Sequence, residues 1–109
     1  MEVRELRVGN YYIWKSEGKD YLYQVEKRDF GSDNYKNFYS VSLTEEWLLD
    51  FGFKNIDKYT FKKGNWFIYK RKRGFVTGSK QRELKLEYVH LVQNWWFGNN
   101  QSELELKSN

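Results

Sequence analysis

The sequence predicts an α+β fold, in which a twisted, mostly antiparallel sheet of about five or six strands carries two short helices. Three observations lead to this prediction. Short runs of aromatic and β-branched residues are separated by Gly-containing turns, which is typical of antiparallel strands. Two later segments instead repeat their apolar residues with helical spacing. The chain has 109 residues, enough for one hydrophobic core, so we expect residues 1–109 to form a single domain.

The first predicted element is a β-hairpin. Residues 11–14 and 21–27 are rich in aromatic and β-branched types, and they flank the turn-forming segment 16–20 with Gly18 near its centre. Residues 31–34 are expected to form a loop, and residues 38–41 a third strand. The sheet is therefore predicted to begin with antiparallel pairing.

The first helix is predicted to begin at residues 42–46 and to run for about two turns. Ser42 or Thr44 can accept hydrogen bonds from the free amides at its start, and Ser42 with Glu45 fits a capping box. Apolar spacing then follows one helical face, with Gly52 placed to end the helix in a left-handed conformation. The residues of this face are Thr44, Trp47, Leu48 and Phe51.

A second hairpin and a second helix follow. Residues 59–62 and 66–71 form the hairpin around a tight turn at 63–65, and a loop or short strand is expected before a strand at 83–86, with Leu84 and Leu86 inward. The helix begins near Tyr88, and we expect Gly98–Asn100 to stop it. Residues 103–107 alternate Glu and Leu as an edge strand does. The predicted apolar stripe of the helix consists of Tyr88, Leu91, Val92 and Trp95.

The charge of the chain is concentrated in residues 58–85. This basic window holds ten Lys or Arg residues and one acid, Glu83, whereas the whole chain carries a formal charge of only +4. Six aromatic residues are interleaved with the cations, as they are in grooves that bind single-stranded nucleic acid. The window therefore predicts a docking surface for a polyanion or an acidic partner.

The candidate contact residues lie at the strand ends and turns of the basic window. A cluster at residues 70–73 is the strongest signal, although a solubilising turn or a Lys-rich edge that prevents sheets from sticking together would have the same sequence. Cations on either side of the cluster can gather with it on one edge of the sheet. The predicted partner- or nucleic-acid-binding residues are Lys62, Lys63, Trp66, Lys70, Arg71, Lys72, Arg73, Lys80 and Arg82.

Trp95–Phe97 allow two interpretations. Trp95 falls on the predicted apolar stripe, whereas Trp96 and Phe97 are rotated away from it by about 100° and 200° in a regular helix. Both aromatic rings are therefore either covered by a strand or exposed at an interface. We favour core packing, because a small sheet protein can bury a helix on more than one side.

The sequence does not favour an enzyme, and we expect no metal and no cofactor. The single histidine, His90, lies off the apolar stripe and is expected to be a surface or structurally hydrogen-bonded residue. No Cys is present to act as a nucleophile or metal ligand, and Glu45, Glu46 and Asp50 are explained by helix capping and dipole effects. The Gly spacing fits no nucleotide-binding motif.

Neither export nor a membrane span is predicted. Residues 1–10 are charged and lack the apolar run of a signal peptide, and apolar stretches elsewhere reach only four or five residues. The absence of Cys fits a reducing compartment. We therefore expect a cytoplasmic protein.

Three segments of the chain resemble a known family. They are residues 5–10 (ELRVGN), 43–53 (LTEEWLLDFGF) and 88–97 (YVHLVQNWWF). In order and spacing they are similar to a family of small uncharacterised proteins from prophages and mobile elements of Bacteroidetes bacteria, which typically reads ELRIGN, LTEEWLLKFGF and YVHQLQNLYFALTGEEL. The chain departs from that pattern at Asp50, Val92, Trp95–Trp96 and Gly98–Asn100, and the cluster at 70–73 is not part of it.

The resemblance implies a bacterial cytoplasmic protein in a mobile-element setting, without implying catalytic residues. Small accessory proteins in that setting often act by stoichiometric binding, as anti-CRISPR inhibitors of bacterial immunity do. The leading hypothesis is therefore a phage-type protein that inhibits a host machine, such as an RNA-guided nuclease, through the basic window. The alternative is direct binding of RNA or single-stranded DNA by the same residues. A purely structural module and an enzyme rank below both.

Overall fold

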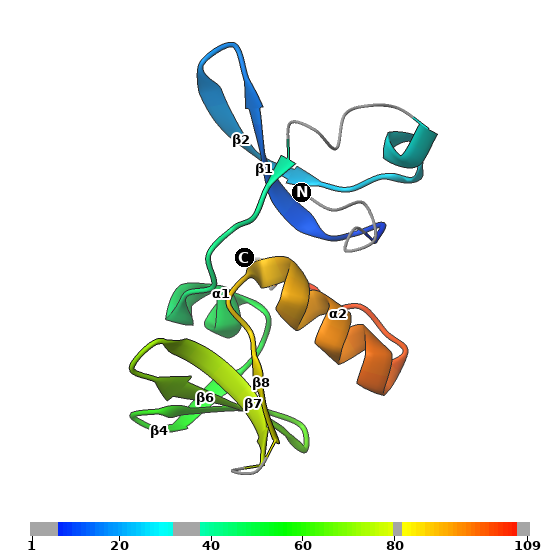
Figure 1. The fold of residues 1–109 in the computed structure, drawn as a ribbon. Helices are drawn as coiled ribbons and strands as arrows, with labels where there is room; N and C mark the ends of the chain where they lie inside the picture. Colours follow the sequence, from blue (N-terminus) through cyan, green and yellow to red (C-terminus); the bar gives the residue numbers. More distant parts are fainter. Residues whose placement is uncertain (1–6, 32–37, 80–81, 107–109) are drawn as a thin grey trace. The chain divides into compact units, whose positions relative to one another are not determined.

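A computed structural model describes residues 7–31, 38–79 and 82–106 of the chain (Figure 1). These residues divide between two compact units, each of which combines one α-helix with one antiparallel sheet. The first unit lies within Met1–Val41 and Tyr88–Glu103, and we call it the three-stranded unit. The second lies within Ser42–Glu87 and Leu104–Asn109, and we call it the five-stranded unit.

The three-stranded unit is built on the predicted N-terminal hairpin. Strands β1 (Tyr11–Ser16) and β2 (Lys19–Gln24) pair antiparallel, and β3 (Phe38–Tyr39) pairs with the other edge of β1. The hairpin closes with Ser16 opposite Lys19, which leaves Glu17 and Gly18 as a two-residue loop. Both loop residues have positive φ, as the turns that match strand twist require.

Aromatic rings fill the core of this unit. Tyr12, Val25 and Phe38 are buried, and Trp14 and Tyr23 pack against them. The ring of Tyr12 stacks on Phe38 with centroids 5.8 Å apart. A short 3-10 helix, η2 (Lys27–Gly31), follows β2.

Helix α2 (Val89–Asn100) belongs to the three-stranded unit and differs from its prediction in two ways. Its buried face consists of Val89, His90, Val92, Gln93 and Trp96, so the expected stripe through Leu91 and Trp95 is displaced by about one residue. The helix also continues through Gly98 as far as Asn100, and Gln101 caps it in the left-handed conformation. A Gly inside a helix costs only about 1 kcal/mol relative to Ala, and the rest of α2 tolerates that cost.

This displacement of the buried face determines where His90, Trp96 and Phe97 lie. His90 is 1% exposed, so of its two expected placements, surface or structurally hydrogen-bonded, the surface one is wrong, and its ring stacks on Tyr12 with centroids 4.8 Å apart. Trp96 is buried, as the core interpretation predicted, whereas Phe97 is 37% exposed. The guanidinium of Arg7 lies 4.3 Å from the Phe97 ring centroid.

The five-stranded unit is an antiparallel meander in which each strand pairs with the next. The hairpin predicted at 59–71 is present, with Gly64 and Asn65 in its turn. A regular strand occupies 74–79, where a loop or short strand was expected, and residues 54–57 form a strand that was not predicted. The strands are β4 (Lys54–Asp57), β5 (Thr60–Lys63), β6 (Trp66–Arg71), β7 (Gly74–Ser79) and β8 (Arg82–Lys85).

Helix α1 (Glu45–Asp50) opens this unit as predicted. Of the two expected caps, Thr44 is the one used, because its Oγ1 accepts a hydrogen bond from the amide of Trp47 at 3.4 Å. Gly52 follows the helix with a φ of +95°. The apolar core of the unit includes Leu48, Phe51, Phe53, Phe61 and Ile68, each 0% exposed.

The α+β class and the antiparallel pairing are thus confirmed, but the strands divide between two sheets where we expected one. Leu86 is buried as predicted, whereas Leu84 is 52% exposed. Residues 103–106 form no strand, although Leu104 is buried, and Lys107 and residues 32–34 lie outside the described part of the chain. Neither α1 nor α2, the two α-helices among the described residues, is long and apolar enough to cross a membrane.

Candidate binding surface

The register of the five-stranded sheet separates the basic window into two faces. Phe61 pairs with Ile68, and Lys70 pairs with Phe75, so these side chains share one face, which we call the inner face. Lys62 pairs with Phe67, and Tyr69 pairs with Val76, which in turn pairs with Lys85. We call this second face the outer face. Neighbours in the sequence of the window therefore have different surroundings.

Two lysines of the inner face hold helix α1. The Nζ of Lys63 donates a hydrogen bond of 2.5 Å to the carbonyl oxygen of Phe51, at the C-terminal end of the helix. The Nζ of Lys70 forms an ion pair of 2.7 Å with Glu45 in the first helical turn. A cation at the carbonyl end of a helix is also favoured by the helix dipole. Both lysines thus have structural roles within the unit, and Trp66 lies half-buried on the same face.

The outer face carries a ladder of cations and aromatic rings, which we call the outer ladder. Its members are Lys62, Phe67, Tyr69 and Arg71. The rings of Phe67 and Tyr69 are almost parallel, with centroids 6.3 Å apart and an interplanar angle of 8°. The Nζ of Lys62 lies 5.6 Å from the Phe67 ring, and the guanidinium carbon of Arg71 lies 5.3 Å from the Tyr69 ring. These distances fit cation–π contacts.

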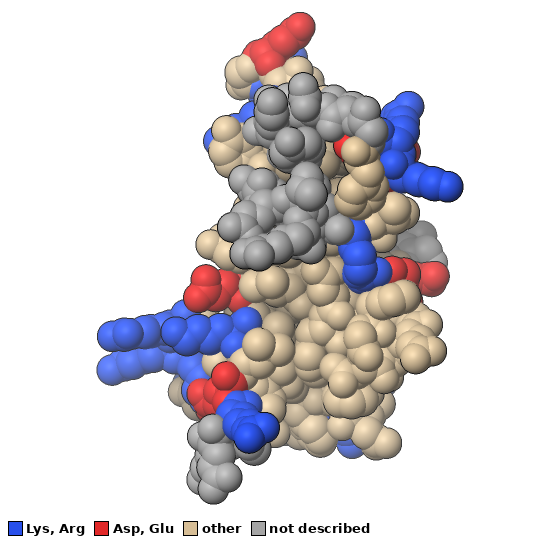
Figure 2. All heavy atoms as spheres, turned by 45° about the vertical axis from the view of Figure 1, so that its right-hand side comes forward, with Lys and Arg blue, Asp and Glu red and all other residues tan. Residues whose placement is uncertain are grey.

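The turn from β6 to β7 extends this basic surface. Lys72 and Arg73 are exposed in the turn, and within the described residues neither forms an ion pair. Arg71 contacts Glu83, with its nitrogen atoms 3.2 and 3.4 Å from one carboxylate oxygen. In Figure 2, a group of long Lys and Arg side chains projects at the lower left, with acidic side chains directly beside it. The surface is therefore basic but interrupted by carboxylates.

Two hollows adjoin the turn. One has a volume of about 380 Å³ and is lined by Tyr59, Lys70, Arg71 and Lys72. The other, which we call the β7–β8 hollow, has a volume of about 350 Å³ and includes residues of β6, β7 and β8. Its lining consists of Arg71, Lys72, Arg73, Gly74, Phe75, Val76, Glu83, Lys85 and Glu87.

The nine predicted contact residues are thus only partly brought together. Lys62 and Arg71–Arg73 share the outer ladder and its adjoining turn, and Arg82 is exposed on β8. Lys80 lies outside the described residues. Lys85, Phe67 and Tyr69 also lie on this surface, although they are not among the contacts predicted from the sequence. Phe67 and Tyr69 could have been predicted from the alternation along β6, because residues 67, 69 and 71 lie on the same face of a strand.

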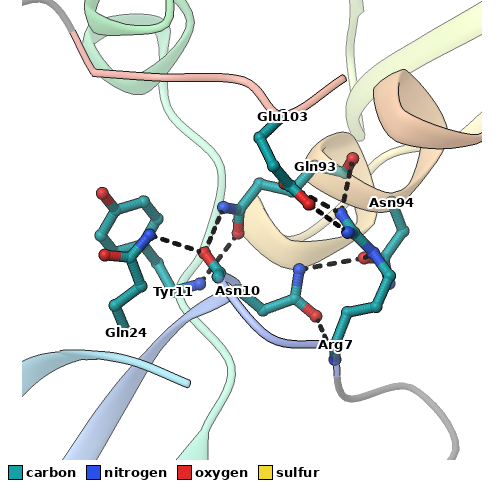
Figure 3. Close-up of polar contacts among 8 residues, drawn as sticks. Arg7, Asn10, Tyr11, Gln24, Gln93, Asn94 and Glu103 are labelled. Atoms are coloured by element: carbon teal, nitrogen blue, oxygen red, sulfur yellow. Dashed lines mark hydrogen bonds and ion pairs between the residues drawn. The ribbon is translucent and has the colours of Figure 1, made fainter. Parts of the chain in front are cut away.

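A polar network occupies the three-stranded unit and joins two of the segments that carry the family resemblance (Figure 3). The Nε of Arg7 and the Nδ2 of Asn10 donate to the Oδ1 of Asn94, at 2.8 and 2.9 Å. Arg7 also forms an ion pair with Glu103. Arg7 and Asn10 come from the first resemblance segment and Asn94 from the third.

Gln93 completes this network from the buried face of α2. Its Oε1 accepts a hydrogen bond of 2.8 Å from the amide of Tyr11, and its Nε2 donates one of 2.8 Å to the carbonyl oxygen of Gly9 (Figure 3). Both ends of this buried amide therefore have partners, which removes the cost of burying it. The network connects the start of β1 to α2, so these polar side chains contribute to the fold of the three-stranded unit.

Comparisons of the chain with protein-family models, with curated proteins and with solved structures found no match.

Proposed function

We propose that this protein is an accessory protein of a phage or another mobile element, and that it acts by stoichiometric binding. Its target in this proposal is a bacterial immunity machine such as an RNA-guided CRISPR nuclease. The observation that carries the binding proposal is the outer ladder together with exposed Lys72 and Arg73. The mobile-element setting rests on the resemblance of the three sequence segments.

The composition of the surface supports a nucleoprotein target. Arg71 already has the carboxylate of Glu83 as a partner, so an acidic group lies among the cations of this surface. A mixed surface of this kind complements a partner that offers its own spaced charges, and it penalises partners with the wrong pattern. An RNA-guided nuclease offers both carboxylates and phosphates.

Interference with a targeted plasmid tests the inhibitory function. Cells with an active RNA-guided nuclease should accept the targeted plasmid when they express this protein, because the bound nuclease cannot cleave. The variant Lys72→Glu/Arg73→Glu should lose this protection, since it reverses the two cations without ion-pair partners among the described residues. The matched control, Lys19→Glu/Lys27→Glu, changes the net charge equally on exposed residues outside the basic window. Equal protection by both variants would refute the assigned surface.

The alternative function is direct binding of RNA or single-stranded DNA. The parallel rings of Phe67 and Tyr69 favour it, because a base can stack on either ring while Lys62 and Arg71 contact phosphates. Direct binding would show a log–log salt slope of about −0.7 per phosphate contacted. It would also disappear when the bound nucleic acid is digested, whereas a protein contact would survive nuclease treatment.

A further inference from the structure

The β7–β8 hollow combines a small volume with converging positive charge. Four of its lining residues are cations and two are carboxylates, a balance of +2. Lys72, Arg73 and Lys85 form no ion pair within the described residues, so their charges are available to a ligand. A single carboxylate would neutralise only half of this balance, whereas a phosphate monoester carries about −1.5 to −2 at pH 7.

The size of the hollow and its other lining residues indicate what kind of molecule the phosphate group belongs to. A volume of about 350 Å³ exceeds what inorganic phosphate needs and lies at the lower end of organic-ligand pockets, which begin near 300 Å³. Val76, which shares the outer face with Lys85, supplies apolar lining next to Gly74, which leaves room for a flat ring. The carboxylate of Glu87 can accept hydrogen bonds from amino or hydroxyl groups.

We propose that the β7–β8 hollow binds one nucleotide, with its phosphate held by Lys72, Arg73 and Lys85. This inference rests on the proposed function, because Arg71–Arg73 belong to the same surface, and it names the chemical unit that this surface recognises. The nucleotide is either free or at the 5′ end of a strand, since both present a phosphate monoester. In an RNA-guided target, the strand would be the RNA component.

The carboxylate of Glu83 competes with the phosphate of the ligand for Arg71. Its contacts to Arg71, at 3.2 and 3.4 Å, are long and lie at the surface, where an ion pair contributes at most about 1 kcal/mol. An incoming phosphate can therefore replace the Glu83 carboxylate on Arg71 at little cost. Removal of the Glu83 charge should tighten nucleotide binding, which is the opposite of what removal of a structural ion pair would do.

Titration calorimetry with AMP, adenosine and inorganic phosphate tests the inference. AMP should bind, and adenosine should bind at least about tenfold more weakly, since it lacks the charged group. Lys85→Ala should weaken AMP binding about tenfold, whereas Lys54→Ala, an equal charge loss on β4, should leave it unchanged. Glu83→Gln should tighten it several-fold, and more than Glu45→Gln, which frees a lysine outside the hollow's lining.

Equal binding of AMP and adenosine, or equal effects of Lys85→Ala and Lys54→Ala, would overturn the inference. Inorganic phosphate that binds as tightly as AMP would do the same, because the ring would then contribute nothing. Binding of a hexanucleotide with and without a 5′ phosphate distinguishes a free nucleotide from a strand end. The 5′-phosphorylated hexanucleotide should bind more tightly than AMP only if a strand end is the natural ligand. If AMP does not bind but Lys72→Glu/Arg73→Glu still abolishes plasmid protection, the nucleotide inference is wrong and the proposed function stands.

Discussion

At the scale of single residues, Gly78 shows how the backbone of β7 limits what the sequence can contain. Its φ is +101°, and a Cβ at this position would lie 2.4 Å from the carbonyl oxygen of Arg82 on β8. Gly64 has a φ of +60° but no heavy atom within 4 Å of its Cβ position. Substitution of Gly64 by Ala therefore has only the cost of a positive φ, whereas substitution of Gly78 adds the cost of a steric clash.

Gly78→Ala is expected to destabilise the protein by at least about 2 kcal/mol more than Gly64→Ala. The control should cost only about 1 to 2 kcal/mol, the usual price of a left-handed residue. Denaturant unfolding of both variants measures the difference. Equal midpoints would show that β7 and β8 separate easily at this position.

The hydroxyl of Tyr23 forms another contact that can be tested by a single substitution. Its hydroxyl donates to the Asp29 carboxylate, at 2.9 and 3.1 Å, and Asp29 also accepts a hydrogen bond from the amide of Glu26. Burial raises the pKa of Tyr23, and the hydrogen bond and negative charge of Asp29 raise the pKa further. Because the pKa is higher in the folded state, the contact stabilises the protein below pH 10.0, the ordinary pKa of tyrosine, and is lost at higher pH.

Tyr23→Phe should therefore lower the free energy of unfolding by about 1.5 to 3 kcal/mol near pH 7, the range for a hydrogen bond to a charged group. Tyr21→Phe serves as the control, since Tyr21 is 52% exposed on the same strand. Unfolding measured from pH 7 to 11 should show the difference between wild type and Tyr23→Phe shrinking above pH 10. A difference that stays constant across this range would contradict the assigned hydrogen bond.

At the scale of elements, the anchoring of α1 depends on side chains from the adjacent sheet. A helix of six residues is too short to be stable alone, so packing and end contacts must hold it. Lys63 supplies one of these contacts at the Phe51 carbonyl, and its neighbour Lys62 points to the other face of the sheet. Substitutions of Lys63 and of Lys62 therefore give a matched test of this contact.

Lys63→Ala should destabilise the five-stranded unit by about 1 to 2 kcal/mol, because a carbonyl loses a charged donor at the helix end. Lys62→Ala should change stability by no more than about 0.5 kcal/mol, as expected of an exposed residue. Hydrogen exchange of the α1 amides measures the local effect. Identical exchange in the two variants would rule out the proposed anchor.

The same elements show what the sequence could and could not predict. The hairpins and α1 were predictable, because Gly18, Gly64 and Thr44 leave local turn and cap signals. Strand β4 was missed, since Lys54–Asp57 is exposed throughout and shows no alternation of apolar residues. The burial of His90 was also missed, because it depends on Tyr12, a contact between distant segments that no local spacing encodes.

At the scale of the whole molecule, the basic window lies entirely within the five-stranded unit. Its net charge could be counted from the sequence, but the division of its side chains could not. Lys63 and Lys70 serve α1, whereas Lys62 and Arg71 join aromatic rings, and only the strand register distinguishes these roles. Strand register depends on pairing across the sheet, which single-sequence patterns leave open.

We propose that the outer ladder and its adjoining turn bind a macromolecular target in a fixed ratio. Affinity capture from extracts of cells that contain the RNA-guided nuclease tests this proposal, with the mass of the captured complex measured by light scattering. We predict a complex of constant stoichiometry for wild type and for Lys19→Glu/Lys27→Glu, and at least about a tenfold loss of capture for Lys72→Glu/Arg73→Glu. Undiminished capture by Lys72→Glu/Arg73→Glu, or no complex with the nuclease for any form, would contradict the account.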